Sequence, residues 1–345
     1  MSWTKRLFRD NLQRLYRYTL PNVKFKESRC GNGEFLVVII SDENPKYEKR
    51  KTPNGMELVN SKIYDLKAKY REWLEQFAVH GTLTDIETNH NLTMLFGKNT
   101  KDFEEQLPEK WNREIEKIQR DLMGSNGWRD LKELFYVMNG TLNYVILRNF
   151  ETLPESIPED HADIDILTND IRLLSHITNA ESSPKNNKIA PLIRVGEKSL
   201  ILDCRWVGDQ YFDESWEKDV LKRKEKHNGI YVPCKEDHFF TLLYHAVIHR
   251  EDLSIEYKDR LRSIGEELQI EDIDNILSNK KSSKKFLEDY MTKNRYKHTT
   301  SVSYVVKHNE IIRLYRTAVF IIKYQGWKKL FKEFNEKLKR VLSVN

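Results

Sequence analysis

Decisive for the fold is the stretch His161-Ala162-Asp163-Ile164-Asp165-Ile166-Leu167, an apolar run interrupted by two acids. Alternate residues of a β-strand point to opposite faces, so a strand here puts both carboxylates on one face and both isoleucines on the other. Two further apolar runs, Tyr144-Val145-Ile146-Leu147-Arg148-Asn149 and Leu200-Ile201-Leu202-Asp203, predict neighbouring strands. The second of them ends in a third acid, Asp203, which we expect at the same place. Gly196-Glu197-Lys198 before this run predicts a hairpin with the apolar run 191–195.

Asp163, Asp165 and Asp203 are therefore candidate metal ligands and catalytic residues. Adjacent like charges cost stability unless a cation neutralises them. Mg²⁺ (or Mn²⁺) is held by one or two carboxylates together with phosphate oxygens, and convergent acids suit metal-assisted phosphoryl or nucleotidyl transfer. The alternative is a structural pair of acids that accept hydrogen bonds from nearby amides.

The pattern of a strand, a two-acid strand and a third acid on a later strand resembles the DNA polymerase β-like nucleotidyltransferase superfamily, over residues 125–250. The resemblance implies that the three aspartates bind the metal. That family usually has Gly-Ser or Gly-Gly after the first strand, where backbone amides meet the nucleotide phosphates. This chain has Leu147-Arg148-Asn149 there. Either the planar guanidinium of Arg148, with Asn149 beside it, binds the phosphate, or the substrate is not an ordinary nucleotide.

The flanking segments 148–154, 203–209 and 231–240 resemble nucleotidyltransferase-like proteins of bacterial and viral polysaccharide gene clusters. This resemblance implies a nucleoside triphosphate or sugar nucleotide as donor. It implies a sugar, a polyol or their phosphate as acceptor. Two alternatives stay open. One is a glycosyltransferase that grips a sugar nucleotide through Asp163 and Asp165, with a nucleotide pocket in the N-terminal sheet. The other is a noncatalytic interaction protein on a nucleotidyltransferase scaffold.

Composition fits a folded protein that works in the cytoplasm. The chain has 345 residues, of which 39% are hydrophobic and 32% charged, and no run approaches the length of a membrane span. Cys30, Cys204 and Cys234 form neither a zinc spacing nor a disulfide framework. The net charge of +5 suits phosphate-bearing partners. Outside the C-terminal helix, aromatic and basic residues are not interleaved as in a nucleic-acid binder, so nucleic acid is not the expected partner.

We expect an α/β (α+β) protein in three parts. Residues 1–115 should form a small N-terminal α/β domain, with strands at 35–40, 77–80 and 92–97 and a helix at 61–76. Residues 116–250 should form the nucleotidyltransferase-like domain with a mixed sheet. Residues 251–345 should form a helical C-terminal region, and the pattern is helical from Lys235 onward. A charged helix is expected at 108–122, since proline is favoured in a first turn.

Five further side chains are weighed for the site. Lys235 and Arg250 are candidate phosphate contacts, although charged helix surfaces are common. His245 and His249 are four residues apart and so share a helix face, but a third zinc ligand is not evident. We expect them to be structural, with one lining the phosphate site. Arg205 is expected to face away from Asp203.

A basic amphipathic helix is predicted at 323–341, with apolar residues at helical spacing and lysines between them. Such a helix packs against the protein body, binds an acidic partner or lies on a membrane surface. Similar tails occur in capsule and lipopolysaccharide enzymes at the inner face of the membrane, which gives peripheral membrane contact as the alternative to a purely cytoplasmic location.

Overall fold

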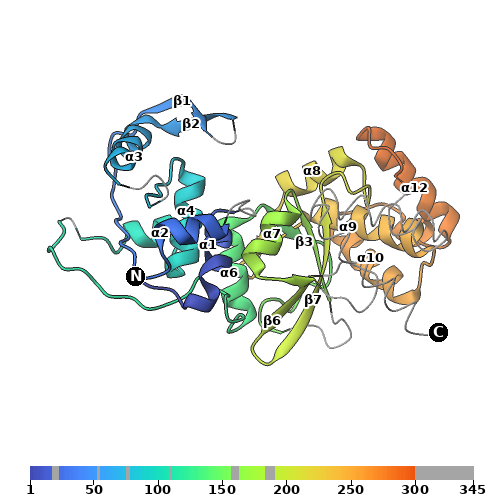
Figure 1. Cartoon of the computed structure of the whole chain (residues 1–345). Helices are drawn as coiled ribbons and strands as arrows, with labels where there is room; N and C mark the ends of the chain where they lie inside the picture. Colours follow the sequence, from blue (N-terminus) through green and yellow to red (C-terminus); the bar gives the residue numbers. More distant parts are fainter. Residues whose placement is uncertain are drawn as a thin grey trace, which may run out of the picture.

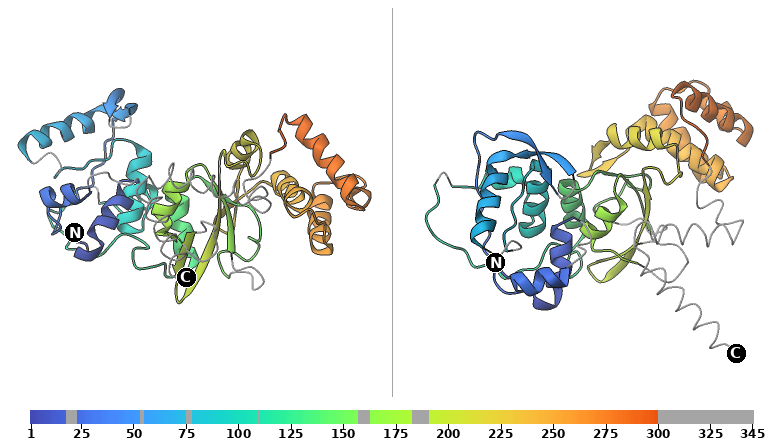
Figure 2. Two further views of the ribbon diagram at one scale, coloured as in Figure 1. Left: turned by 45° about the vertical axis from the view of Figure 1, so that its right-hand side comes forward. Right: turned by 45° about the horizontal axis from the view of Figure 1, so that its top comes forward.

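The computed structural model describes residues 1–17, 23–52, 55–74, 78–108, 110–156, 163–182 and 191–299. The protein is of mixed α/β class, as expected. The N-terminal part lies at one end, a five-stranded sheet in the middle and the C-terminal helices at the other end (Figure 1). The same elongated arrangement is visible from two further directions (Figure 2).

The sheet has the order β3-β4-β7-β6-β5. Its strands are β3 (Tyr144–Ile146), β4 (Asp163–Thr168), β5 (Glu181–Ser182), β6 (Pro191–Val195) and β7 (Lys198–Trp206). Strand β4 pairs with β7 in parallel, and the other neighbours are antiparallel. The predicted strands around Tyr144, Asp163 and Leu200 are confirmed, as is the hairpin that turns at 196–198.

Each face of the sheet packs on its own hydrophobic cluster. Ile164 and Ile166 of β4 point into a cluster with α6 (Leu131–Thr141) and α7 (Ile171–Thr178). Leu167, which lies on the opposite face, packs with α8 (Glu214–Lys222), α9 (Lys235–Tyr244) and the helices that follow. The aspartates of β4 share the face of Leu167. They therefore look towards the C-terminal half of the chain.

The helices after the sheet agree with the prediction of a helical region from residue 235. They are α9, a π-helix at His245–Arg250, α10 (Ile255–Glu267), α11 (Ile273–Ile276) and α12 (Lys280–Lys293). A short hairpin, β8 (Glu225–His227) with β9 (Ile230–Val232), precedes them. Among the described helices there is none whose length and apolarity would let it cross a membrane. The predicted basic helix at 323–341 lies outside the described residues.

The predicted N-terminal sheet is wrong. A 3₁₀ turn at Lys5–Leu7 leads into α1 (Phe8–Leu15) and α2 (Val23–Cys30). A two-stranded hairpin of β1 (Tyr47–Thr52) and β2 (Gly55–Asn60) follows, then α3 (Ser61–Trp73), α4 (Asp85–Phe96) and α5 (Thr100–Glu104). The helix predicted at 61–76 is confirmed as α3. Residues 35–40 are not in a strand, and neither are the described residues 78–80 of the strand predicted at 77–80.

Local signals explain why residues 92–97 are helical. The hydroxyl of Thr84 accepts a hydrogen bond from the Glu87 N–H and so caps α4, while Asp85 adds an acid to its first turn. Gly97, with φ of 67°, ends the helix. A short buried apolar run fits a strand and a helix equally well, and here the cap decides.

The helix predicted at 108–122 is also wrong: the described residues of this segment contain none. Contacts with the N-terminus replace it. The Asp121 carboxylate accepts hydrogen bonds from the Thr4 N–H and hydroxyl, at 2.8 and 2.7 Å, and from Asn11 at 2.8 Å. Ser2 forms a parallel bridge with Gln119. Tertiary pairing has overridden local helix propensity.

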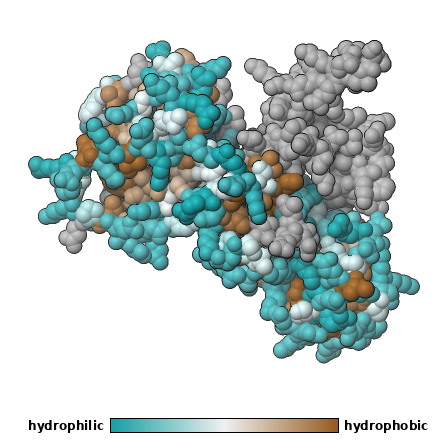
Figure 3. Space-filling view, turned by 90° about the horizontal axis from the view of Figure 1, so that it is seen from below, coloured by the Kyte–Doolittle hydropathy of each residue, from teal (hydrophilic) through white to brown (hydrophobic). Residues whose placement is uncertain are grey.

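The hydrophobic clusters cross both expected boundaries. Phe8 and Met94 of the N-terminal part pack in the same cluster as Leu134 and Ile166. Leu261 of α10 packs in the cluster beneath the other face of the sheet. The division at 115 and 250 stays a prediction. Apolar side chains also reach the surface, as the brown patches on the N-terminal part show (Figure 3).

A buried pair of acids makes stability depend on pH. Glu217 is fully buried and accepts hydrogen bonds from the Gly208 and Phe212 N–H groups at 2.7 and 3.1 Å. Burial raises the pKa of Glu217, and the nearby Asp209 carboxylate adds to the rise. Burial also raises the pKa of Asp209. A raised pKa means that the folded protein holds a proton that the unfolded chain releases.

We therefore predict that the contribution of the Glu217–Asp209 pair to the free energy of unfolding is complete at low pH and is lost as the pH rises above about 5, where an unfolded glutamate is ionised. Urea denaturation at several pH values measures it. Glu217→Gln should flatten the dependence, since it mimics the protonated acid. The exposed neighbour Glu214→Gln is the control. Equal slopes for Glu217→Gln and the wild type would contradict the assignment.

Candidate functional site

The sheet brings the acids of β4 and β7 onto one face. Asp165 lies directly opposite Asp203 in the parallel register, and Asp163 lies opposite Ile201. Asp163 is two residues from Asp165 and so shares its face. Asp165 is buried, whereas the other two carboxylates are partly exposed. The expectation that a neighbouring strand delivers Asp203 beside the acid pair is confirmed in this register.

Arg148 neutralises Asp165. The Leu147 N–H donates to the Asp165 carbonyl at 2.9 Å, which extends the pairing of β3 and β4 by one residue. The guanidinium of the next residue donates from Nε to Oδ2 of Asp165 at 3.1 Å and from Nη2 to Oδ1. Both side chains are buried, at 8% and 6% exposure. This is a bidentate, charge-assisted pair in the interior.

Tyr211 continues the network on the far side of Arg148. Its hydroxyl accepts a hydrogen bond from Nη1 of Arg148 at 3.0 Å and lies 2.7 Å from Nδ1 of His245. Because the arginine can only donate, the tyrosine proton is left for the imidazole. Nε2 of His249 donates to the Tyr211 carbonyl at 3.1 Å. Both histidines come from the π-helix that follows α9, a rare conformation often found at functional sites.

Arg205 occupies the same face, contrary to the expectation that it faces away from Asp203. It is two residues along β7 from Asp203, so strand alternation places the two together. Nη2 of Arg205 lies 3.3 Å from Oδ1 of Asp203, and the guanidinium lies over the Tyr211 ring, 4.2 Å from its centre. Each of the two facing acids thus has its own arginine.

Electrostatics follow from this crowding. Burial raises the pKa of the Asp165 carboxyl; the Arg148 guanidinium opposes that rise, and the carboxylates of Asp203 and Asp163 add to it. Burial, followed by the positive charge of Arg148, lowers the pKa of His245. Burial and the two arginines lower the pKa of His249 to about 3. Both imidazoles are therefore neutral at physiological pH.

The three acids have the right chemistry for a hard divalent cation, since all are carboxylates. In this arrangement, however, they do not form a ligand shell. Among the described residues there is no group of three or more histidine, cysteine, aspartate or glutamate side chains that could hold a metal ion. Asp165 and Asp203 each contact an arginine instead. A metal would have to take Asp165 from Arg148.

Of the remaining predicted phosphate contacts, one lies near the Arg148–Tyr211–His245 network, and the other two pair with residues outside it. Arg250 ends the π-helix, and its charge contributes to the lowered pKa of His245, so it lies near the network. Asn149 turns the chain with a left-handed φ of 56°, and its side chain accepts a hydrogen bond from Arg260 at 2.8 Å. Lys235 forms an ion pair with Glu267 at 2.6 Å at the surface.

Sequence reasoning missed Tyr211, the residue on which the network centres. It lies between β7 and α8, in a segment without periodicity, and nothing local marks it. The position of Arg205 could have been predicted, because residues two apart on a strand share a face and Arg205 is two residues from Asp203.

Comparison with protein-family models, with curated proteins and with solved structures found no match to this chain.

We predict that Tyr211→Phe lowers the free energy of unfolding by about 1–3 kcal/mol, because it leaves the Arg148 donor and the His245 acceptor without their partner. Equilibrium urea unfolding measures the loss. Tyr257→Phe, on partly buried Tyr257 of α10, serves as control. A loss no larger than in the control would show that the network does not stabilise the fold.

Proposed function

We propose that the protein is a metal-dependent nucleotidyl- or phosphoryltransferase. The observation that carries the proposal is the in-register placement of Asp165 and Asp203 on neighbouring parallel strands, with Asp163 two residues before. Asp163, Asp165 and Asp203 would hold Mg²⁺ or Mn²⁺. When bound, such an ion neutralises charge on phosphate oxygens. Asp203 is less buried than Asp165, which it faces. It would also accept the proton of an attacking hydroxyl.

Arg148 is the residue proposed to meet the substrate phosphate. A guanidinium fork that binds a carboxylate through two donors binds a phosphate in the same way. An incoming phosphate therefore competes with Asp165 for Arg148. Exchange of one anion for the other would free the Asp165 carboxylate at the moment the substrate arrives. The neighbouring Tyr211 hydroxyl keeps one guanidinium nitrogen in place.

The substrates are proposed from sequence resemblance alone: a nucleoside triphosphate or sugar nucleotide as donor, and a sugar, a polyol or their phosphate as acceptor. The glycosyltransferase alternative rested on a nucleotide pocket in an N-terminal sheet. The described N-terminal residues form a two-stranded hairpin instead of that sheet. A cytoplasmic location, with the inner face of the membrane as alternative, stays part of the proposal.

A second candidate is a noncatalytic scaffold, and the buried Arg148–Asp165 pair favours it. A permanent pair of this kind leaves Asp165 no role towards a metal. Loss of one partner from a buried pair typically costs about 3–5 kcal/mol, because the other charge is left uncompensated.

Substitution of Asp163 tests the proposed metal site with the least structural damage. Apart from the strand pairing of its backbone, Asp163 makes no hydrogen bond or ion pair with the described residues, and its charge adds to the crowding at Asp165. Asp163→Asn should therefore leave the melting temperature without ligand unchanged or slightly higher. It should abolish the stabilisation that Mg²⁺ and a nucleoside triphosphate give together, measured by thermal shift. Asp65→Asn, on the exposed side of α3, is the matched control.

An intact Mg²⁺-dependent shift in Asp163→Asn would contradict the metal assignment. Asp165→Asn tests the same site less cleanly. Loss of that charge should destabilise the protein, because Arg148 loses its partner, so this variant cannot separate a metal role from a structural one.

Arg148→Met distinguishes the two candidate functions. In both, it lowers stability in EDTA, since Asp165 is left unpaired. If Asp165 is a metal ligand, Mg²⁺ or Mn²⁺ should restore much of the lost stability, and the metal-induced shift should exceed that of the wild type. Arg148→Lys keeps the charge and should weaken nucleotide binding through loss of the fork. A variant that metal does not rescue supports the noncatalytic scaffold.

A further inference from the structure

A second polar site lies in the N-terminal part, between the β1–β2 hairpin and α3. A cavity of about 500 Å³ opens there. The residues of α3 that line the cavity are spaced three or four apart, so they lie on one face of the helix. The lining residues are Lys51, Thr52, Tyr64, Lys67, Ala68, Arg71, Glu72 and Leu83.

The cations of this cavity are held by neutral groups. Nζ of Lys67 donates to the Gly81 carbonyl at 2.9 Å. Nε and Nη2 of Arg71 donate to the Val79 carbonyl at 3.2 and 3.1 Å. In the part of the chain that the structure describes, neither cation forms an ion pair, and Lys51 across the cavity forms none either. These contacts fix the position of the two charges without neutralising them.

Positive charge is in excess here. Three cations line the cavity against one acid, Glu72. Burial lowers the pKa of Lys67; Glu87 opposes this, and the charges of Arg71 and Lys26 add to it. A set of like charges held together and partly dehydrated is unfavourable until an anion enters. The volume is within the range of small-molecule sites.

We propose that this cavity binds a phosphate-bearing small molecule. With Nε and Nη2 of Arg71 directed at the Val79 carbonyl, its Nη1 N–H groups and the second N–H of Nη2 remain to pair with phosphate oxygens. Lys67 and Lys51 supply point charges from the helix and the hairpin. Three cations from two elements match an anion of more than one negative charge, such as a diphosphate. The Tyr64 side chain lines the same wall, and its hydroxyl donates to the Lys51 carbonyl at 3.0 Å.

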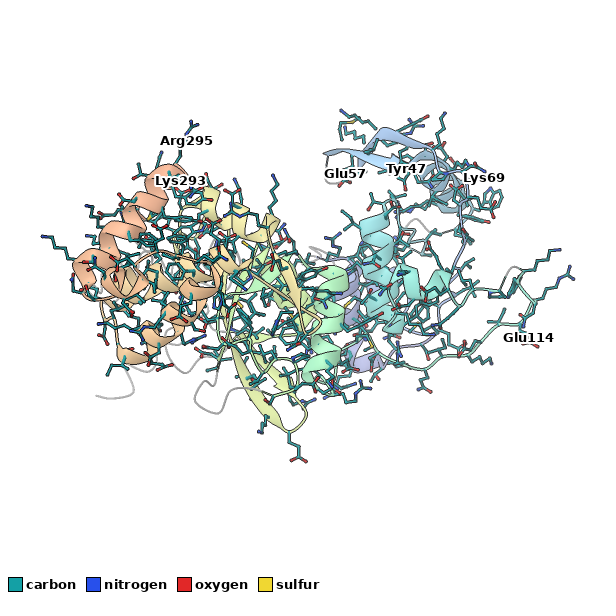
Figure 4. All side chains as sticks on the ribbon, turned by 180° about the vertical axis from the view of Figure 1, so that it is seen from behind. Tyr47, Glu57, Lys69, Glu114, Lys293 and Arg295 are labelled. Atoms are coloured by element: carbon teal, nitrogen blue, oxygen red, sulfur yellow. The ribbon has the colours of Figure 1, made fainter. Side chains whose placement is uncertain are left out.

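This site is independent of the acids on the sheet and of any metal there. Tyr47, Glu57 and Lys69 mark the hairpin and α3, which lie in a part of the molecule remote from Lys293 and Arg295 of the C-terminal helices (Figure 4). Failure of the proposed transferase function would therefore leave this second site unaffected, and the reverse also holds.

Isothermal titration of the full chain with inorganic pyrophosphate in EDTA tests it, at constant ionic strength. Omission of divalent metal keeps the sheet site out of the measurement. We expect saturable binding with a stoichiometry of one. Lys51→Gln should weaken it about tenfold or more, since a hydrogen-bonded charge is lost and no contact to the loop is disturbed. Lys67→Gln should weaken it likewise.

Two further variants test whether the charge balance of the cavity controls pyrophosphate binding. Glu72→Gln removes the opposing charge and should tighten binding. Lys69→Gln, on the same helix with its Nζ 5.1 Å from the Trp73 ring, should leave binding unchanged. Melting temperatures verify that each variant is folded. Parallel titrations with a nucleoside diphosphate and a sugar phosphate show which phosphate source binds best.

Pyrophosphate binding that Lys51→Gln and Lys67→Gln reduce, and that Glu72→Gln increases, supports the proposal. It is overturned by absence of saturable binding, by equal losses in Lys69→Gln, or by binding only of a long polyanion such as an oligonucleotide.

Discussion

Two carboxylates that face each other across neighbouring parallel strands, Asp165 on β4 and Asp203 on β7, impose the main constraint on this protein. Their charges lie at the border of a hydrophobic cluster, where the attraction of a counter-charge is strong and an uncompensated charge is costly. The chain meets the constraint with Arg148 and Arg205. Tyr211 contacts both of these guanidinium groups.

The surroundings are arranged so that both arginines stay charged and fixed. Tyr211 receives a hydrogen bond from Arg148 and lies beneath Arg205, so one aromatic residue links the two ion pairs. His245 and His249 stay neutral because burial and the arginines disfavour a further positive charge. The same C-terminal helices that bring the histidines also form the hydrophobic cluster on this face. Fold stability and site geometry are therefore coupled.

The sequence predicted the central sheet well because its signals are local. Alternation around Asp163 and Asp165 and the turn at 196–198 fixed strands and faces without knowledge of the rest of the chain. The N-terminal part could not be predicted in this way. Residues 92–97 satisfy a strand pattern but follow a helix cap at Thr84. The segment before Asp121 is determined by contacts with Thr4, more than a hundred positions away in the sequence. The contacts of Arg148 are also long-range, since it meets Tyr211 only in the folded chain.

In the proposed transferase, Arg148 and a divalent cation compete for Asp165, and a substrate phosphate is the alternative partner of the arginine. A crystal structure with Mn²⁺ and a non-hydrolysable nucleoside triphosphate analogue tests it most directly, because anomalous scattering locates the metal. We expect Mn²⁺ bound by Asp163, Asp165 and Asp203, with the Arg148 guanidinium turned from Asp165 to a phosphate. An undisturbed Arg148–Asp165 pair, with Mn²⁺ elsewhere or nowhere, would contradict it.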